Sequence, residues 1–207
     1  MIKKFLLTFV LFALISCGPV VWFPPEIDLV PYERVGLISF SIENARGDLD
    51  AMATQRFLQV ITRHQRGVQV IELGTLERVL ARIHQAGLDQ EAAAAIGEHF
   101  GVSSFFYGEI KVSDVKPQID IAGLIRNMTV RATFDIFMTA RLYSTETGAT
   151  LWTDSADRKG VLGYMMMGPE RIPYFGVRDQ EETYRRLTED LIYDLTLDFR
   201  PTRRRMR

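Results

Sequence analysis

Cysteine and histidine are scarce in this sequence. Its 207 residues include one cysteine, Cys17, and three histidines. A single cysteine excludes a disulfide within the chain and a metal site built from several thiolates. The histidines, His64, His84 and His99, each fall in the last turn of a predicted helix, where the helix dipole favours a partly charged imidazole. No two of them are at ligand spacing on one helix, so the sequence predicts no metal site.

Motifs of catalysis and of cofactor binding are also absent from the sequence. It has no Gly-x-Ser-x-Gly, no glycine-rich phosphate loop and no His-Glu-x-x-His. Adjacent acids, Glu181 with Glu182 and Glu189 with Asp190, lie on predicted helix surfaces and are expected to be solvated rather than to act as acid and base. The formal net charge of −1 argues against a nucleic-acid partner. We therefore expect no catalytic residue, no cofactor and no nucleic-acid partner.

A short apolar stretch precedes Cys17. Lys3 and Lys4 are followed by an apolar segment over residues 5–15 and by the small residue Ser16. These are the parts of a secretory signal, and the apolar run is too short for a membrane-spanning helix of about 20 residues. Residues 14–17, Leu-Ile-Ser-Cys, resemble the bacterial lipobox. The resemblance implies that residues 1–16 are removed as a signal peptide and that the thiol of Cys17 carries diacylglycerol.

The lipobox resemblance also implies a location and a first partner. Acylation at Cys17 would anchor the chain to a membrane, because two ester-linked acyl chains bury far more methylene than a single myristoyl group. By resemblance to bacterial sorting signals, Gly18 in place of aspartate after Cys17 favours the outer membrane of a Gram-negative cell. The expected location is the periplasmic side of that membrane. An ordinary signal peptide, or a membrane anchor that contains a cysteine, is the alternative.

Proline and arginine are concentrated in the segments that flank the predicted domain. Residues 17–32 contain four prolines, and proline at this density resists helix and sheet, which predicts an extended tether. Within the tether, Trp22 and Phe23 are candidate partner contacts. Residues 201–207 form an arginine-rich tail that we expect to be solvated and disordered, with a contact to anionic lipid or to a partner as the alternative.

Residues 33–200 are predicted to form one domain of the α/β class, with a mixed sheet and helices packed on it. Apolar runs predict buried strands, and apolar residues three and four apart predict helices with one buried face. The predicted strands cover residues 35–40, 68–73, 102–112, 128–142 and 149–155. The predicted helices cover residues 48–64, 76–86, 90–100 and 180–199. Expected helix ends are N-caps at Thr75, Asp89 and Asp179 and a left-handed stop at Gly101.

The clearest period-2 pattern lies at residues 128–142. Every even position in this range is apolar and most odd positions are polar, which predicts a strand with one buried face and one wet face. This strand could extend backward, because Ile119 and Ile121 in the preceding insertion are apolar.

Residues 160–177 contain glycine and proline without alternation, which predicts a loop. The loop includes a run of large side chains that either packs on the core or forms a soft surface for a partner. These candidate partner contacts are Tyr164, Met165, Met166 and Met167.

Short motifs follow one another in a fixed order from Val70 onward. They are Val70-Ile71-Glu72, Leu76-Glu77-Arg78-Val79-Leu80, Gly87-Leu88, Ala94-Ala95-Ile96-Gly97, Phe100-Gly101-Val102, Gly108-Glu109-Ile110 and a hairpin from Leu142 to Trp152. This ordered set resembles the CsgG-like family of periplasmic lipoproteins, and the resemblance covers roughly residues 35–199. It implies a mixed sheet with packed helices, akin to the anticodon-binding-like fold shared by the amino-terminal domain of TolB and by LpoB.

The CsgG-like resemblance implies binding or assembly, since none of these relatives is known as an enzyme. We therefore expect a non-enzymatic, lipid-anchored factor that binds protein partners in envelope biogenesis or secretion. One alternative is an activator of a periplasmic enzyme, as in LpoB-like proteins. Another is a homo-oligomeric pore subunit like that of the curli channel, in which each subunit donates two β-hairpins to the transmembrane channel.

The pore alternative fits the two insertions of this chain poorly. A membrane-spanning strand needs about 9 to 11 alternating residues, so a spanning hairpin needs about 20 or more. Residues 113–127 number fifteen and residues 160–177 number eighteen, and both segments contain proline. The sequence therefore favours a binding or assembly factor over a pore subunit.

Overall fold

The computed structural model describes residues 20–43, 48–122, 127–167, 173–177 and 179–205. Its strands are β1 (Val20–Phe23), β2 (Arg34–Ile38), β3 (Ser41–Glu43), β4 (Gln69–Gly74), β5 (Ser104–Val112), β6 (Lys116–Ala122), β7 (Asn127–Ser144), β8 (Thr150–Met167), β9 (Pro173–Val177) and β10 (Thr202–Arg205). Its helices are α2 (Leu49–His64), α3 (Leu76–Arg82), α4 (Gln90–Phe100) and α5 (Gln180–Leu195). Two short 3-10 turns, η1 (Val30–Tyr32) and η2 (Leu197–Phe199), complete the described elements.

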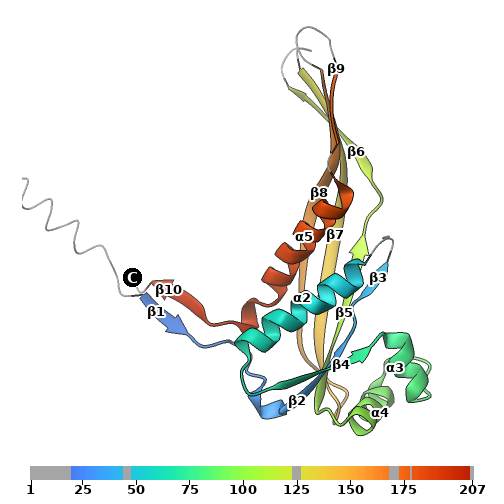
Figure 1. The fold of residues 1–207 in the computed structure, drawn as a ribbon, viewed down its shortest axis with the longest axis vertical. Coiled ribbons are helices and arrows are strands. Elements are labelled where there is room, and N and C mark those ends of the chain that lie inside the picture. The colour runs from blue at the N-terminus through green and yellow to red at the C-terminus, as the bar shows by residue number, and fades with distance from the viewer. Residues whose placement is uncertain (1–19, 44–47, 123–126, 168–172, 178, 206–207) are drawn as a thin grey trace, which may run out of the picture.

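The larger sheet joins strands from most of the described chain (Figure 1). Its main path has the order β4-β2-β5-β7-β8-β9, with β3 paired to β5 and β6 paired to β7. β2 is parallel to β4 and to β5, whereas β5, β7, β8 and β9 are antiparallel to their neighbours on this path. The sheet is therefore mixed, as the sequence predicts.

Helices cover both faces of the sheet (Figure 1). α2 and α5 share one core with the sheet, and this core includes Phe57, Phe106 and Leu191. α3 and α4 form a second core on the other face, which includes Val79 and Ile96. Apolar residues three and four apart in each helix supply the buried faces. The prediction of an α/β fold with helices packed on a mixed sheet is confirmed.

In β7, apolar side chains at even positions face the core, as the alternating sequence predicts. Phe134, Ile136 and Met138 belong to the core shared with α2 and α5 and are buried. Phe137, which lies between two of them in the chain, is 50% exposed. Successive side chains of a strand point to opposite faces, so this strand has one core face and one wet face.

Three of the four predicted helix ends follow the expected chemistry. Asp89 accepts a hydrogen bond from a backbone N–H of α4 at 2.9 Å, and Asp179 does the same at the start of α5. Gly101 ends α4 in a left-handed conformation with φ of 65°. Thr75 has the extended backbone of an N-cap, but its side chain makes no cap bond to α3.

Residues 160–177 were predicted to be a loop, and the prediction is wrong because they contain paired strands. β8 continues to Met167, and β9 pairs with it from Pro173 onward. The pairing of β7 with β8 shifts between Ala132 and Thr133, which leaves Leu162 of β8 without a directly paired position. One extra residue inverts the alternation beyond it, so a continuous strand has an irregular sequence pattern.

The insertion before β7 also contains a strand. β6 pairs with the beginning of β7 as an antiparallel hairpin, so Ile119 and Ile121 lie in a separate strand and do not extend β7 backward beyond Asn127. Within the described sheet, β6 is an edge strand, and proline is tolerated there because an edge residue need not donate a ladder hydrogen bond. Pro117 is therefore compatible with β6.

A separate two-stranded ribbon consists of β1 and β10, which are antiparallel (Figure 1). β1 lies in the segment expected to be an extended tether, and β10 lies in the arginine-rich tail. The expectation that the tail is disordered is wrong for Thr202–Arg205, since these residues pair with Val20–Phe23, whereas Arg203 is exposed to solvent as expected. Composition does not indicate this pairing, because the two strands are separated by almost the whole domain.

Candidate functional site

An arm of four strands extends beyond the helices (Figure 1). It consists of β6, β9 and the adjoining ends of β7 and β8, residues 127–133 and 160–167. α5 begins at Gln180 and packs along β8, and the arm projects past this end of the helix. Among the described residues, the arm is the part of the large sheet that has no helix on either face.

The register of the arm places apolar residues in a row across its strands. Ile119 pairs with Val130, and Val130 pairs with Met165. Directly paired residues of antiparallel strands share one face of a sheet. We define Ile119, Val130 and Met165 as the apolar face of the arm. The same backbone register forms two adjacent rows, which are Ile121, Met128, Met167 and Pro173, and Pro117, Ala132, Gly163 and Val177.

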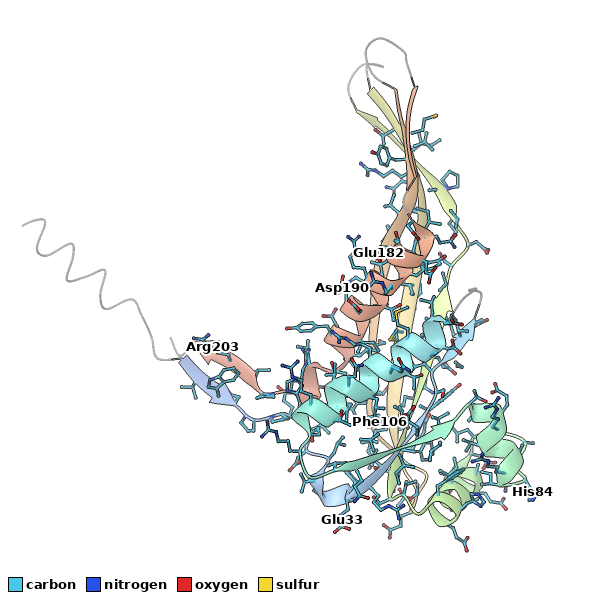
Figure 2. The ribbon with its side chains drawn as sticks, in the orientation of Figure 1. Glu33, His84, Phe106, Glu182, Asp190 and Arg203 are labelled. Carbon is cyan, nitrogen blue, oxygen red and sulfur yellow. The ribbon has the colours of Figure 1, made fainter. Side chains whose placement is uncertain are left out.

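The residues that alternate with the apolar face point to the opposite side of the arm, and we call them the alternate row. Arg131 pairs with Gln118 on one side and with Tyr164 on the other, and Tyr164 pairs with Gly176. A Cβ atom added at Gly176 would lie 2.4 Å from the ring of Tyr164, so this ring lies against the backbone of β9. Side chains stand out on both sides of the arm (Figure 2). The arm therefore has one apolar and one mainly polar face.

The apolar face continues the core face of the sheet. Phe134 of β7 is 1% exposed, and its ring packs against Tyr184 of α5 with centroids 4.7 Å apart. Ala132 and Val130, the next residues on this face toward the arm, are only partly buried. Ile119, which is paired with Val130, is 60% exposed. Core-like residues thus continue past the end of α5 into a region without a covering helix in the described structure.

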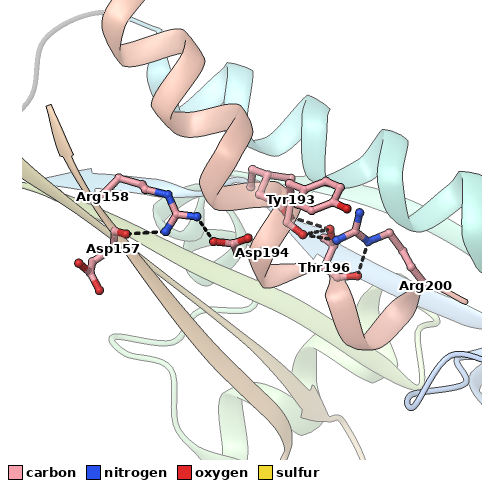
Figure 3. A network of polar contacts seen from close by, with 7 residues as sticks. Asp157, Arg158, Tyr193, Asp194, Thr196 and Arg200 are labelled. Atoms are coloured by element: carbon pink, nitrogen blue, oxygen red, sulfur yellow. Dashed lines mark hydrogen bonds and ion pairs between the residues drawn. The ribbon is translucent and has the colours of Figure 1, made fainter. Parts of the chain in front are cut away.

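Polar contacts hold the other end of α5 against β8 (Figure 3). Arg158 of β8 donates a hydrogen bond to the carboxylate of Asp194 in α5. Trp152 Nε1 donates to Asp198 Oδ2 at 3.0 Å. Burial raises the pKa of Asp154, and the negative charges of Asp198 and Asp194 raise it further. These contacts join the last turn of α5 and the following turn η2 to β8.

The four candidate contacts at residues 164–167 lie in β8, within the arm. Met165 belongs to the apolar face, and Tyr164 lies in the alternate row. For Met166 and Met167 the structure describes only the backbone. The expectation of a loop that packs on the core is wrong because this run is part of a paired strand. Partner binding by these residues stays a prediction.

The other candidate contacts lie on the ribbon, away from the arm (Figure 1). Trp22 is 67% exposed and Phe23 is also exposed. Trp22 pairs with Arg203 of β10. Cys17, the predicted lipidation site, lies outside the described residues. The structure therefore brings Trp22 next to the arginine-rich tail and does not bring it to Tyr164 or Met165.

Sequence reasoning missed Ile119 and Val130 as candidate contacts. Both are apolar and lie in alternating stretches, so a local signal for strands was present. The missing information was the register, since only pairing between β6, β7 and β8 places Ile119, Val130 and Met165 in one row.

The described residues contain no group of three or more His, Cys, Asp or Glu side chains that could hold a metal ion. His64 and His99 lie in the last turns of α2 and α4, as predicted. His84 does not, because α3 ends at Arg82 and His84 follows with φ of 56°. Burial lowers the pKa of His64, and the charges of nearby arginines lower it further.

Two open hollows lie beside α4. The larger has a volume of about 470 Å³ and is lined by Asp89, Gln90, Glu91, Ala94 and Glu146. The smaller, of about 300 Å³, is lined by Ile83, Ala95, Glu98 and His99. Neither lining places a serine, cysteine or lysine nucleophile beside a base, so neither resembles a site for nucleophilic catalysis. In the part of the chain that the structure describes, none of the helices has the length and apolarity needed to cross a membrane.

No family model matches the chain, and no curated protein matches its sequence. The CsgG-like resemblance therefore stays a prediction. Several solved structures are similar in backbone arrangement. The PelC dodecamer from Paraburkholderia phytofirmans is 11% identical, with a TM-score of 0.47 over 88% of this chain and 97% of the PelC chain.

Two further solved structures are also similar in backbone arrangement. The LpoB C-terminal domain from Salmonella enterica is 9% identical, with a TM-score of 0.35 over 61% of this chain and 82% of that chain. Lipoprotein GNA1162 from Neisseria meningitidis is 17% identical, with a TM-score of 0.37 over 62% of this chain and 83% of that chain. Similarities with identities and TM-scores this low assign the chain to no family and no function.

Proposed function

We propose that this chain is a lipid-anchored envelope protein without enzymatic activity, and that it binds a protein partner through the apolar face of the arm. The observation that carries the proposal is the continuation of the core face past the end of α5, where Val130 and Met165 are only partly buried and Ile119 is largely exposed. Contiguous apolar surface of this kind marks interaction sites on soluble domains.

The shape of the arm supports binding rather than chemistry. Its strands form a two-faced surface, and the polar residues in its alternate row include Gln118 and Arg131. Met165, at the β8 end of the apolar face, has an unbranched side chain that adapts to partners of different shape. A sheet surface of this kind can receive a complementary apolar surface or an added strand at the β6 edge.

The lipobox at Cys17 supports anchoring at the membrane. Diacylglycerol on Cys17 would hold the domain on the periplasmic side of the outer membrane, where the arm would meet envelope proteins. Within this proposal, the partner is either an assembly or secretion component or, as for an LpoB-like activator, a periplasmic enzyme.

A second candidate function is that of a subunit in an oligomeric secretion pore of the CsgG type. The specific observation in its favour is the arrangement of β6 with β7 and of β8 with β9 as two adjacent hairpins that share an apolar face. Against it, β6 has 7 residues and β9 has 5, whereas a membrane-spanning strand needs about 9 to 11. We therefore rank the pore below the binding factor.

Site-specific crosslinking in cells tests the proposed binding face. A photoreactive phenylalanine analogue at Ile119 is expected to form an adduct with a partner protein under illumination. The matched control is the same analogue at Phe137, which is exposed on the wet face of β7 in the body of the sheet. Equal adducts from both positions, or no adduct from position 119, would contradict binding through the arm.

Size-exclusion chromatography and electron microscopy of the detergent-extracted protein separate the two candidate functions. A monomer or dimer contradicts the pore, and a ring with density across the bilayer contradicts the binding factor. Labelling with radioactive fatty acid tests the anchor independently. We expect incorporation into the natural chain and its loss in Cys17→Ala.

A further inference from the structure

The ribbon of β1 and β10 places aromatic and basic residues side by side. Trp22 of β1 pairs with Arg203, Val21 pairs with Arg204, and Val20 pairs with Arg205. Trp22 is 67% exposed, and Arg203 is exposed as well. The ribbon extends away from the sheet and from the arm (Figures 1 and 2). Its surface is therefore available to something outside the chain.

The base of the ribbon is attached to the domain by buried hydrogen bonds. The side-chain amide of Gln65 donates to the backbone carbonyls of Ile27 and Phe199, both at 2.9 Å. Its side-chain oxygen accepts from Leu29 N at 2.9 Å. Ile27 N also donates to Asp198 O at 3.0 Å. The two chain segments that lead into β1 and β10 are thus tied to each other and to the end of α2.

A second contact supports the base on the side of β10. The guanidinium of Arg200 lies 3.8 Å from the ring centroid of Tyr193, and Arg200 Nε donates to Thr196 O at 3.0 Å (Figure 3). Arg200 is thereby used inside the domain, whereas the arginines of β10 lie farther along the ribbon. The segment that leads into β10 is therefore held against the end of α5.

The two segments that form the ribbon differ sharply in charge from the whole chain. Residues 17–25 contain no charged side chain, and residues 200–207 contain five arginines and no acid. The whole chain has a formal net charge of −1. Pairing of β1 with β10 thus concentrates positive charge next to Trp22, a residue type that favours the boundary between lipid and water.

We propose that the ribbon is a second membrane contact, in which the arginines of β10 bind the phosphates of anionic lipids and Trp22 lies at the level of the headgroups. The proposal rests on the lipid anchor proposed above. Cys17 precedes Val20 by three residues, so an acylated Cys17 and the start of β1 are at most about 10 Å apart. The anchor would therefore hold the ribbon within reach of the headgroups, where each arginine adds electrostatic attraction.

Fluorescence of Trp22 in reconstituted vesicles tests this contact. The chain has two tryptophans, and the other, Trp152, is 8% exposed. When phosphatidylglycerol replaces part of the phosphatidylcholine, we expect the emission of the acylated protein to shift to shorter wavelength. The shift should be absent in Trp22→Phe. Emission that is the same in anionic and in neutral vesicles would overturn the proposal.

Charge variants of β10 give the second arm of the test. The triple variant Arg203→Gln/Arg204→Gln/Arg205→Gln should lower the equilibrium constant for contact between the ribbon and the anionic membrane on the order of 100-fold. The corresponding lysine variants should retain the shift, and so should a control, Arg66→Gln/Arg78→Gln/Arg82→Gln, on exposed arginines of the body. A glutamine variant of β10 that behaves like the natural chain would overturn the proposal.

Intact mass spectrometry of the same samples separates failure of the anchor from failure of the ribbon. A chain without acyl groups on Cys17 would contradict the proposed anchor whatever the fluorescence shows. An acylated chain whose Trp22 emission wavelength is the same with and without anionic lipid would contradict the ribbon contact alone.

Discussion

At Gly97 and Gly108, a neighbouring side chain leaves no room for a Cβ atom. A Cβ atom at Gly97 of α4 would lie 2.5 Å from Thr145 Cβ, and Thr145 is held in place by its hydrogen bond to Val102 O at 2.9 Å. Gly108 of β5 is in a similar position, because an added Cβ would lie 2.2 Å from the ring of Phe40. Close contact with a neighbouring side chain, rather than backbone flexibility, accounts for both glycines.

Replacement of Gly97 by alanine should destabilise the protein despite the better helix propensity of alanine. Alanine gains about 1 kcal/mol in a helix interior, but overpacking against Thr145 costs about 1 to 3 kcal/mol. We expect a net loss of up to about 2 kcal/mol in the free energy of unfolding, measured by urea denaturation. Gly87→Ala is the matched control, since no atom lies within 4 Å of its added Cβ, and it should have little effect. Equal effects of the two changes would contradict the packing argument.

Among the elements, α5 and the end of α2 determine where the arm and the ribbon leave the body of the protein. α5 covers the core face only as far as Phe134, so the arm begins where the helix begins. At the other end, Gln65 after α2 joins the segments that lead into β1 and β10. Both binding surfaces proposed for this protein are therefore positioned by helices that do not belong to them.

Loss of the Gln65 side-chain amide should weaken the base of the ribbon. Gln65 is buried, and Gln65→Leu would leave Leu29 N, Ile27 O and Phe199 O without this partner. Buried polar groups without partners cost about 1 to 3 kcal/mol each, and the bonds to Leu29 N and Phe199 O are the two buried ones, so we expect a loss of about 2 to 6 kcal/mol on urea unfolding. Gln55→Leu, at an exposed position of α2, should change the unfolding free energy by less than about 0.5 kcal/mol. Similar losses for both variants would contradict the assigned role.

At the scale of the whole molecule, the protein has a body with two cores and two projections that differ in chemistry (Figure 1). The arm offers an apolar face, and the ribbon offers arginine beside tryptophan. Because the projections leave the body in different directions, contact of the ribbon with a membrane would leave the arm available to a protein partner.

Hydrogen exchange should separate the body from the arm. β5 is paired on both sides and contributes Phe105, Phe106 and Ile110 to the buried cores, so its amides should exchange through global unfolding. β6 is an edge strand with exposed residues, and its amides should exchange at least about 100-fold faster. Mass spectrometry of peptides from the two strands measures the difference. Equal protection would show that the arm is as stable as the body.

Much of the body could be predicted from local patterns. Alternation identifies the core face of β7, and apolar spacing identifies α2 and α5. The arm was only partly predictable, because Leu162 interrupts the alternation of β8 and makes a continuous strand look like a loop. The local pattern at Ile119 was visible, but its place in an apolar row depends on pairing with β7.

The sequence by itself determines what depends on neighbouring residues: the alternation of β7, the turn at Gly101 and the lipobox pattern that ends at Cys17. Only the tertiary structure decides which strands pair and which faces the helices leave open. The ribbon is the clearest case, since Val20 and Arg205 meet across almost the whole chain. Such pairing depends on where the folded body places the two segments, and no periodicity within either segment encodes that position.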